Sequence, residues 1–256
     1  MIGVVKTSTR TCLFSLGLSG SDSALVSQEK VESRIIVDKK PKPVKVGKAS
    51  VVACDLDGVI GDIVQQLLLF SHRKHGLSLA AADIVSENFD MCTPIRRDQL
   101  QKFFESDEFF RSLPVLPGSR EALLRLRAAG CEIHIVTDRF WYREIDRDTT
   151  DWLTRNEIPF DSVIFARKVE KPHFAAQLSA NWFIEDRLSN ALLLSPVCRV
   201  LLVDRPYNQG STPESVIRVH DISRAAEVIT DTLNNSTGRK RISRSRQGTR
   251  AYGSLV

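Results

Sequence analysis

The sequence contains no Cys-x-x-Cys pair, and its cysteines are few, scattered and odd in number. Structural zinc sites need closely spaced ligand pairs, and disulfide frameworks need an even set of cysteines in a short secreted chain. Neither feature is present. The five cysteines are Cys12, Cys54, Cys92, Cys131 and Cys198. They favour a reducing compartment, and we expect a cytoplasmic protein.

Long apolar runs are also missing. No segment approaches the roughly 18–20 apolar residues that a membrane-spanning helix needs, so we expect no membrane partner. Acidic residues are absent from the C-terminal stretch, which carries six of the basic residues between Arg239 and Arg250. Taking those six charges from the net charge of +5 leaves −1 for residues 1–238. The folded part therefore gives no reason to expect a nucleic-acid binder, and attachment through the basic tail is the minority alternative.

The chain divides by composition into three parts. Residues 1–48 have no sustained hydrophobic period and end in a Lys/Pro-rich linker, so we expect a disordered leader, with a targeting peptide as the alternative. Residues 49–235 have the alternating pattern of a globular domain. Residues 236–256 are rich in Ser, Arg and Gly, and we expect a disordered basic tail.

Strand-like and helix-like segments alternate through the central part, which predicts an α/β fold with a three-layer, parallel sheet. Strands are expected at 50–55, 132–137, 162–166, 182–185 and 199–204, and helices at 119–129, 141–156, 173–180, 187–195 and 221–234. Residues 61–112 break the alternation, because they contain no convincing strand and hold six of the twelve phenylalanines. We expect a small helical cap there, inserted after the first core strand. Its phenylalanines are expected to form the cap's own core rather than a stacking platform for a base.

The most informative segment is the run Val51–Val59, in which apolar residues lead into two carboxylates and a glycine. Asp55 and Asp57 are two apart, and residues two apart share one face of a strand. Parallel α/β sheets bind ligands at the carboxyl ends of their strands, so this face should become a site. Two carboxylates this close repel each other unless a proton or cation lies between them, which predicts a metal.

Three later strand ends supply the other groups that phosphoryl transfer needs. Thr137 ends one apolar run and offers a hydroxyl for phosphate oxygens. Lys171 would offset the charge of a nucleophile and phosphate, and Pro172 after it suits the first turn of a helix, although Lys168 is an alternative. Glu185 and Asp186 end a further run, and an additional carboxylate would complete an oxygen-only site that suits Mg²⁺.

These four motifs, in this order, resemble the haloacid dehalogenase superfamily of aspartate-nucleophile phosphohydrolases. The resemblance implies a Rossmann-like fold with a helical cap and a magnesium-dependent phosphomonoesterase. It implies that Asp55 attacks phosphorus and that Asp57 protonates the leaving oxygen and then activates water. It also implies that Thr137 holds the phosphate, that Lys171 orients and neutralises it, and that Asp55, the backbone carbonyl of Asp57 and Asp186 bind Mg²⁺.

A finer resemblance is to the type C 5'-nucleotidases, the 5'(3')-deoxyribonucleotidase group. It rests on the position of the cap, on Phe183–Arg187 with Asn190, and on Asp204–Asn208. It implies a nucleoside monophosphate as substrate. Another small phosphoester, such as a sugar phosphate or a nucleic-acid 3'-phosphate, and a non-catalytic binding module are the alternatives. In the second motif this chain has Thr137-Asp138-Arg139, where the group typically has Thr-Ser-Pro.

Three further residues are candidate substrate contacts. They are Asp138, Arg139 and Glu185. A surface ion pair is the alternative for Arg139, and a hydrogen bond to nearby backbone is the alternative for Glu185.

Overall fold

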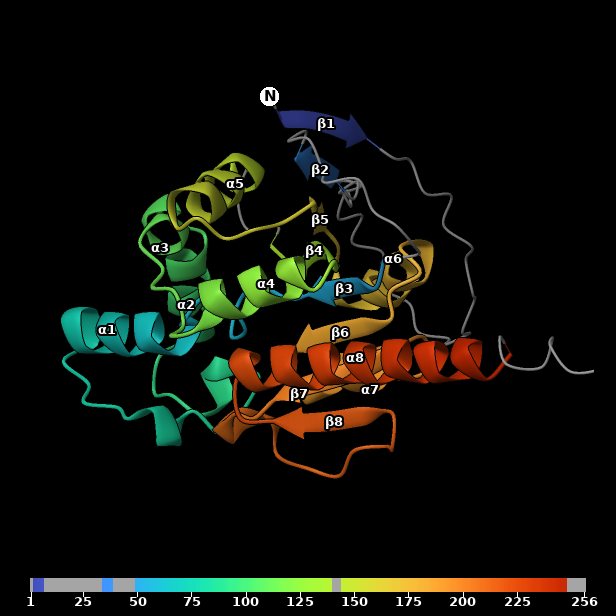
Figure 1. Cartoon of the computed structure of the whole chain (residues 1–256). Coiled ribbons are helices and arrows are strands. Elements are labelled where there is room, and N and C mark those ends of the chain that lie inside the picture. Colours follow the sequence, from blue (N-terminus) through green and yellow to red (C-terminus); the bar gives the residue numbers. More distant parts are fainter. Residues whose placement is uncertain (1, 7–33, 39–48, 140–143, 248–256) are drawn as a thin grey trace, which may run out of the picture.

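The computed structural model describes residues 2–6, 34–38, 49–139 and 144–247. Its centre is an eight-stranded sheet, with six neighbouring strands parallel and two antiparallel strands added at one edge (Figure 1). In spatial order the strands are β1 (Ile2–Lys6), β2 (Arg34–Asp38), β5 (Ser162–Phe165), β4 (Glu132–Thr137), β3 (Val51–Cys54), β6 (Trp182–Glu185), β7 (Arg199–Val203) and β8 (Val216–Val219). The parallel α/β sheet predicted from the sequence is confirmed.

Helices cover both faces of the sheet, which gives the expected three layers (Figure 1). Helix α4 (Ser119–Ala128) packs beside α8 (Ile222–Gln247) on one face. On the other face α6 (Lys171–Gln177) lies beside α7 (Leu188–Leu194). Helix α5 (Ile145–Arg155) lies near the cap and packs against α3 (Asp107–Arg111). The expectation of a helix at 141–156 includes residues 141–143, which lie outside the described part.

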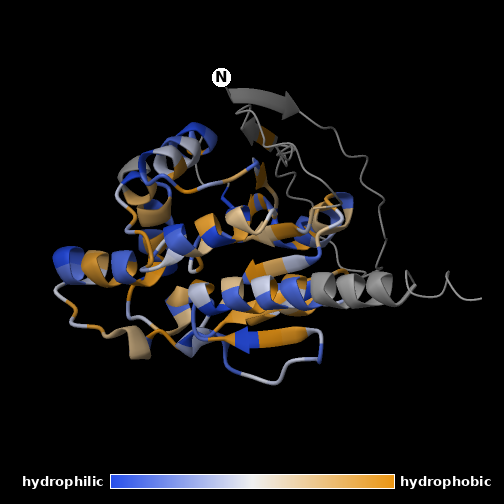
Figure 2. Cartoon of the chain, viewed as in Figure 1, coloured by the Kyte–Doolittle hydropathy of each residue, from blue (hydrophilic) through white to orange (hydrophobic). Residues whose placement is uncertain are grey.

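The near-continuous apolar runs of the central strands follow from burial on both faces. Val52 and Cys54 pack into one hydrophobic cluster, whereas Ala53 between them packs into the other. Phe183 and Ile184 of β6 divide in the same way. Figure 2 shows these strands as apolar ribbons between helices whose hydropathy alternates along their length.

Residues 61–112 form the expected helical cap beyond the carboxyl ends of the strands (Figure 1). The cap contains α1 (Ile63–His75), two 3₁₀ turns at Ala81–Asp83 and Phe89–Met91, α2 (Arg97–Phe104) and α3. Four of its phenylalanines pack on one another, and Phe70 stacks on Phe103 with ring centroids 3.8 Å apart. Three phenylalanines, including buried Phe104 and Phe110, also line a pocket over the sheet. The cap core and the pocket wall therefore share side chains.

The structure differs from the expectations outside the central domain. Strands β1 and β2 lie within residues 1–48, where no strand was expected, and Ile36 of β2 is buried against the core. Within the central domain strand β8 was also missed, because Arg218 interrupts its apolar run and only its two end residues are buried. Helix α8 runs to Gln247, through residues expected to be disordered. A helix anchored by buried Ala225 and Ile229 extends readily into a basic segment, since Lys and Arg are good helix formers.

The division of the chain at residues 48 and 235 stays a prediction. Among the described residues, no helix is both long and apolar enough to cross a bilayer.

Candidate active site

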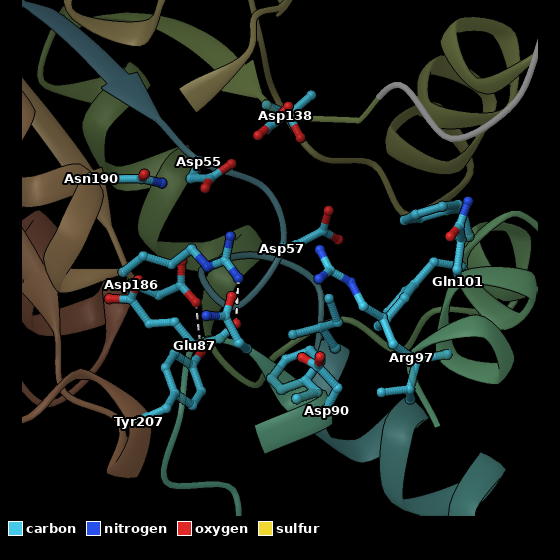
Figure 3. Close-up of a pocket in the computed structure, with 18 of the residues that line it drawn as sticks. Asp55, Asp57, Glu87, Asp90, Arg97, Gln101, Asp138, Asp186, Asn190 and Tyr207 are labelled. Atoms are coloured by element: carbon cyan, nitrogen blue, oxygen red, sulfur yellow. Dashed lines mark hydrogen bonds between the residues drawn. The ribbon is translucent and has the colours of Figure 1, made fainter. Parts of the chain in front are cut away.

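The parallel register brings the predicted residues to one edge of the sheet. Cys54 of β3 pairs with Ile135 of β4 and with Ile184 of β6. Asp55 therefore leaves β3 between the strand ends that carry Thr137 and Glu185. Figure 3 shows Asp55, Asp57, Asp138 and Asp186 around one cavity at this edge. The sequence thus predicted which residues would meet.

A buried ion-pair cluster holds Asp55. The Nζ atom of Lys171 donates to Oδ2 of Asp55 over 2.6 Å and to Oε2 of Glu185 over 3.1 Å. All three residues are buried. Burial alone would lower the pKa of Lys171, but the carboxylates of Asp55 and Glu185 outweigh it and hold that pKa above its ordinary value. The lysine is a fixed cation beside Asp55.

Lys171, rather than Lys168, occupies the position predicted for the third motif. It is the first residue of α6, and Pro172 follows it in the first turn, where a missing N–H costs nothing. Lys168 is half-buried in the preceding 3₁₀ turn, and its backbone N–H donates to Asp138 over 3.3 Å. Asp138 itself is exposed and lines the pocket.

Three buried oxygen atoms of pocket-lining residues lack a partner among the described residues. They are Oγ1 of Thr137, Oδ1 of Asp186 and Oδ1 of Asn190. Buried polar atoms are nearly always hydrogen-bonded, so unpartnered oxygens beside a pocket indicate a ligand that completes them. A phosphate oxygen would suit the hydroxyl, and a hard cation would suit the carboxylate.

Asp186 is held from the other side by a segment that sequence reasoning gave no role. The hydroxyl of Tyr207 donates to Oδ2 of Asp186 over 2.5 Å (Figure 3), and Asn208 donates to its backbone carbonyl over 2.6 Å. Burial and the charge of Asp55 raise the pKa of Asp186 to about 6, although the Tyr207 hydrogen bond opposes the shift. One oxygen of Asp186 is thereby fixed and the other stays open.

Gly58 makes room for this carboxylate. Its φ of +79° is unfavourable for residues with a side chain, and an added Cβ would lie 2.0 Å from Oδ2 of Asp186 and 2.9 Å from the Tyr207 hydroxyl. The glycine after the two aspartates is therefore needed for a turn and for a close approach at the same point.

The acidic cluster that could hold a metal ion consists of Asp55, Glu185 and Asp186, whose ligand atoms lie within 4.8 Å of one another. Both oxygens of Glu185 are already engaged, one with Lys171 and the other with the Asn190 side-chain amide at 2.8 Å. Burial and the charge of Asp55 raise the pKa of Glu185, against the effect of Lys171. Asp55 and Asp186 fit a hard cation better, and the carbonyl of Asp57 as a third ligand stays a prediction.

Arg139 is neither on the surface nor in the pocket lining. Its side chain is fully buried, and its Nε and Nη2 atoms donate to the two carboxylate oxygens of Asp57 over 2.8 and 2.5 Å. The sequence predicted that Arg139 contacts the substrate or forms a surface ion pair. A surface location is wrong, because Phe110 of the cap and Thr149 of α5 cover the guanidinium. Glu185 likewise lies outside the pocket lining.

The cavity over these residues has a volume of about 280 Å³. Its floor carries Asp55, Asp57, Asp186 and Thr137, and its cap side carries apolar and polar side chains in equal number, with Glu87 and Asp90 among the polar ones. The cap residues that line it are Ile63, Glu87, Asn88, Phe89, Asp90, Arg97, Leu100, Gln101, Phe104 and Phe110. Sequence reasoning missed Arg97 and Gln101, because their four-residue spacing on one helix face has no signature of its own.

A polar contact joins the cap to the core beside the pocket. The carboxylate of Glu87 accepts hydrogen bonds from the backbone N–H of Ser189, over 3.0 Å, and from its hydroxyl. The guanidinium of Arg187 donates to the Glu87 carbonyl. Because Arg187 follows Asp186 directly, this contact ties the cap loop to the segment that carries the candidate metal ligand.

Comparisons with known proteins give the family. The model of the family described as 5' nucleotidase, deoxy (pyrimidine), cytosolic type C protein (NT5C) matches residues 49–233. A nucleotidase of Clostridium acetobutylicum is 27% identical over 173 residues, which are 66% of this chain and 88% of the relative.

Similar solved structures are more distant. A D,D-heptose 1,7-bisphosphate phosphatase from B. bronchiseptica, complexed with magnesium and phosphate, has a TM-score of 0.46 and 16% identity, with 72% of this chain and 99% of that one covered. A HAD phosphatase from Thermococcus onnurineus has a TM-score of 0.46 and 19% identity, with 70% and 97% covered.

Proposed function

This chain belongs to the family described as 5' nucleotidase, deoxy (pyrimidine), cytosolic type C protein, and we propose that it hydrolyses nucleoside monophosphates with Mg²⁺ through an aspartyl-phosphate. The family match confirms the resemblance that the four motifs predicted, so the protein is a phosphatase of the haloacid dehalogenase superfamily. The substrate, the metal and the intermediate are the parts that we propose.

The observation that carries the proposal is the environment of Asp55. Its carboxylate lies on the floor of the pocket, 2.6 Å from the buried Lys171 ammonium and beside the orphan oxygens of Thr137 and Asp186. A nucleophile needs this combination of a fixed orientation, a partly offset charge and a place for phosphate oxygens.

In the first step a carboxylate oxygen of Asp55 forms a bond to phosphorus, and the bond from phosphorus to the leaving oxygen breaks. Asp57, which enters this step protonated, gives that oxygen its proton and becomes a carboxylate. In the second step Asp57 takes a proton from water, the water oxygen bonds to phosphorus, and the Asp55–phosphorus bond breaks to release inorganic phosphate. Lys171 keeps Asp55 in position throughout, and Thr137 holds a phosphate oxygen.

The donor set suits a hard divalent cation. Asp55 and Asp186 would hold Mg²⁺ with the Asp57 carbonyl, and only oxygen ligands are involved. When bound, the ion supplies positive charge against the phosphate oxygens. The pocket wall also fits the proposed substrate, since the partly exposed ring of Phe89, beside the buried rings of Phe104 and Phe110, offers apolar surface for a base or sugar.

A phosphate-release assay tests the proposal. Purified protein with Mg²⁺ is offered deoxynucleoside and nucleoside monophosphates, sugar phosphates and 3'-phosphorylated oligonucleotides. We expect nucleoside monophosphates to be turned over best and Asp55→Asn to abolish turnover, whereas Asp151→Asn, an exposed change on α5, should leave it intact. Preference for another class would replace the substrate proposal, and turnover that survives Asp55→Asn would remove the mechanism.

The proposal includes a reducing, cytoplasmic location. It rests on the four described cysteines, Cys54, Cys92, Cys131 and Cys198, all of which are free thiols. A nucleic-acid contact of the basic tail stays the minority prediction.

A further inference from the structure

The catalytic roles of Asp55, Asp57, Thr137 and Lys171 do not explain why Asp57 forms a buried ion pair with Arg139. Three nitrogen atoms of the guanidinium are engaged, two by the Asp57 carboxylate and Nη1 by the Thr149 hydroxyl at 3.2 Å. The side chain of Arg139 is 0% exposed, whereas that of Asp57 is 20% exposed at the pocket. Burying the Arg139 guanidinium costs desolvation free energy unless its hydrogen-bond partners are well placed, so the position of this charge calls for an explanation.

Arg139 orients the Asp57 carboxylate as well as balancing its charge. A guanidinium fork that meets both oxygens of a carboxylate sets the plane and the direction of that carboxylate, which a lysine cannot do. Asp57 leaves the end of β3 on a turn, and no other side chain among the described residues is recorded in a hydrogen bond with its carboxylate. Its orientation toward the pocket therefore depends on Arg139.

The fork is itself held by two separate elements. Thr149 belongs to α5, and the ring of Phe110, from α3 of the cap, lies 4.3 Å from the guanidinium carbon. Phe110 is buried and also lines the pocket. The same ring thus contacts the guanidinium and belongs to the cavity lining, so a residue of the cap touches the group that holds Asp57.

We propose that Arg139 is a positioning residue that acts only through Asp57, and that Phe110 makes this positioning depend on the cap. The inference rests on the proposed function. Arg139 contacts neither substrate nor phosphate. It orients the Asp57 carboxyl group, which when protonated gives its proton to the leaving oxygen and then, as the carboxylate paired with Arg139, takes a proton from water.

This role has a kinetic signature. p-Nitrophenolate is a stable anion that leaves phosphorus without a proton, whereas the alkoxide of a nucleoside needs one. With p-nitrophenyl phosphate, a misplaced Asp57 should therefore impair only the second step, in which water must be activated. With a nucleoside monophosphate it should impair both steps. A general structural weakening would slow the two substrates alike.

The test compares Arg139→Lys, which keeps the charge in place but not the fork, with Arg125→Lys, an exposed change on α4. We expect Arg139→Lys to lower kcat on the nucleotide by about 10²-fold or more, within the range of general acid–base catalysis. With p-nitrophenyl phosphate it should release a rapid burst of nitrophenol close to one per active site, followed by slow turnover. Arg125→Lys should behave as the wild type.

A double-mutant cycle gives the second readout. In an Asp57→Asn background Arg139→Lys should cost little more, because the group through which Arg139 acts has already been removed. Phe110→Leu, which keeps an apolar side chain but removes the ring, should shift kcat in the same direction by a smaller factor.

Three results separate the proposals. The role of Arg139 would be overturned if the losses of kcat from Asp57→Asn and Arg139→Lys multiplied in the double mutant. It would also be overturned if Arg139→Lys lowered kcat equally on the nucleotide and on p-nitrophenyl phosphate, without a burst. Wild-type activity on p-nitrophenyl phosphate and another alkyl phosphate, but not on nucleotides, would remove the proposed substrate, and the comparison for Arg139 would then be made with that alkyl phosphate. No turnover of any phosphoester by the wild type would remove both.

Discussion

Replacing Lys171 by methionine tests whether the site depends on its buried cation. Lys171 is 1% exposed and lies 2.6 Å from Asp55 and 3.1 Å from Glu185, so its removal leaves two buried carboxylates without their counter-ion. Removing one partner of a buried ion pair typically costs about 3–5 kcal/mol of stability, and little solvent is present here to screen the loss. We expect a loss of this size at pH 8 without divalent ions.

The loss should depend on pH in a defined direction. Burial and Asp55 already raise the pKa of Glu185, and Lys171 is the group that opposes this rise. Without the lysine, native Glu185 should hold its proton over a range where the unfolded chain has lost it. The native state then binds more protons than the unfolded state, so stability should increase as pH falls. The penalty should therefore be largest at pH 8 and smaller near pH 5.

Urea unfolding followed by circular dichroism, in EDTA, measures the effect at both pH values. Lys168→Met is the matched control, because Lys168 is half-buried three residues earlier and should cost no more than about 0.5 kcal/mol. Adding Glu185→Gln to Lys171→Met should restore part of the loss at pH 8. A Lys171→Met protein that is as stable as the control, or equally destabilised at both pH values, would refute the reasoning.

The remaining predictions concern the metal and the cap. Gly58→Ala should weaken Mg²⁺ binding at least tenfold by calorimetry, because the new methyl group collides with Asp186. Gly76→Ala is the control, since Gly76 also has a positive φ of +65° but has open space around it, and it should leave Mg²⁺ binding unchanged. Equal effects of the two substitutions would contradict this prediction. Mg²⁺ affinity should fall as pH drops below about 6, because protons then compete for Asp186; an affinity independent of pH between 7 and 5 would exclude it as a ligand. Glu87→Gln should weaken the contact between Glu87 of the cap and Ser189 of the core, and should raise KM more than it lowers kcat. Hydrogen exchange of the Ser189 backbone amide should become faster. Unchanged exchange would show that the Glu87–Ser189 contact does not hold the cap.

The residues that the sequence placed well share one property. Asp55, Thr137 and Asp186 each end or follow an apolar run, and a parallel sheet brings such ends together whatever the loops do. Lys171 was identified by the proline after it, which marks the start of α6. These are local signals, so a single sequence contains them.

Other parts depend on contacts between segments that no local pattern records. Tyr207 contacts Asp186, and Arg139 contacts Asp57, although the partners are 21 and 82 residues apart. The sequence does not tell whether an arginine after a strand is exposed in a loop or buried against a carboxylate. Strand β2 was missed because it is stabilised by pairing with β1 and β5 and by burial of Ile36, and its own five residues do not show these contacts. Burial in the structure distinguishes the two lysines in the same way as Pro172 did in the sequence, because Lys171 is 1% exposed and Lys168 is only half-buried.

Covalent capture of the intermediate tests the central claim most directly. The wild type and Asp57→Asn are mixed with p-nitrophenyl phosphate and Mg²⁺, quenched in acid within milliseconds to seconds, digested and analysed by mass spectrometry. The account predicts a phosphoryl group on the peptide that carries Asp55, with a larger amount in Asp57→Asn because its removal by water is slowed. Phosphate on another residue, or rapid turnover with Asp55 unmodified at every time point, would contradict it.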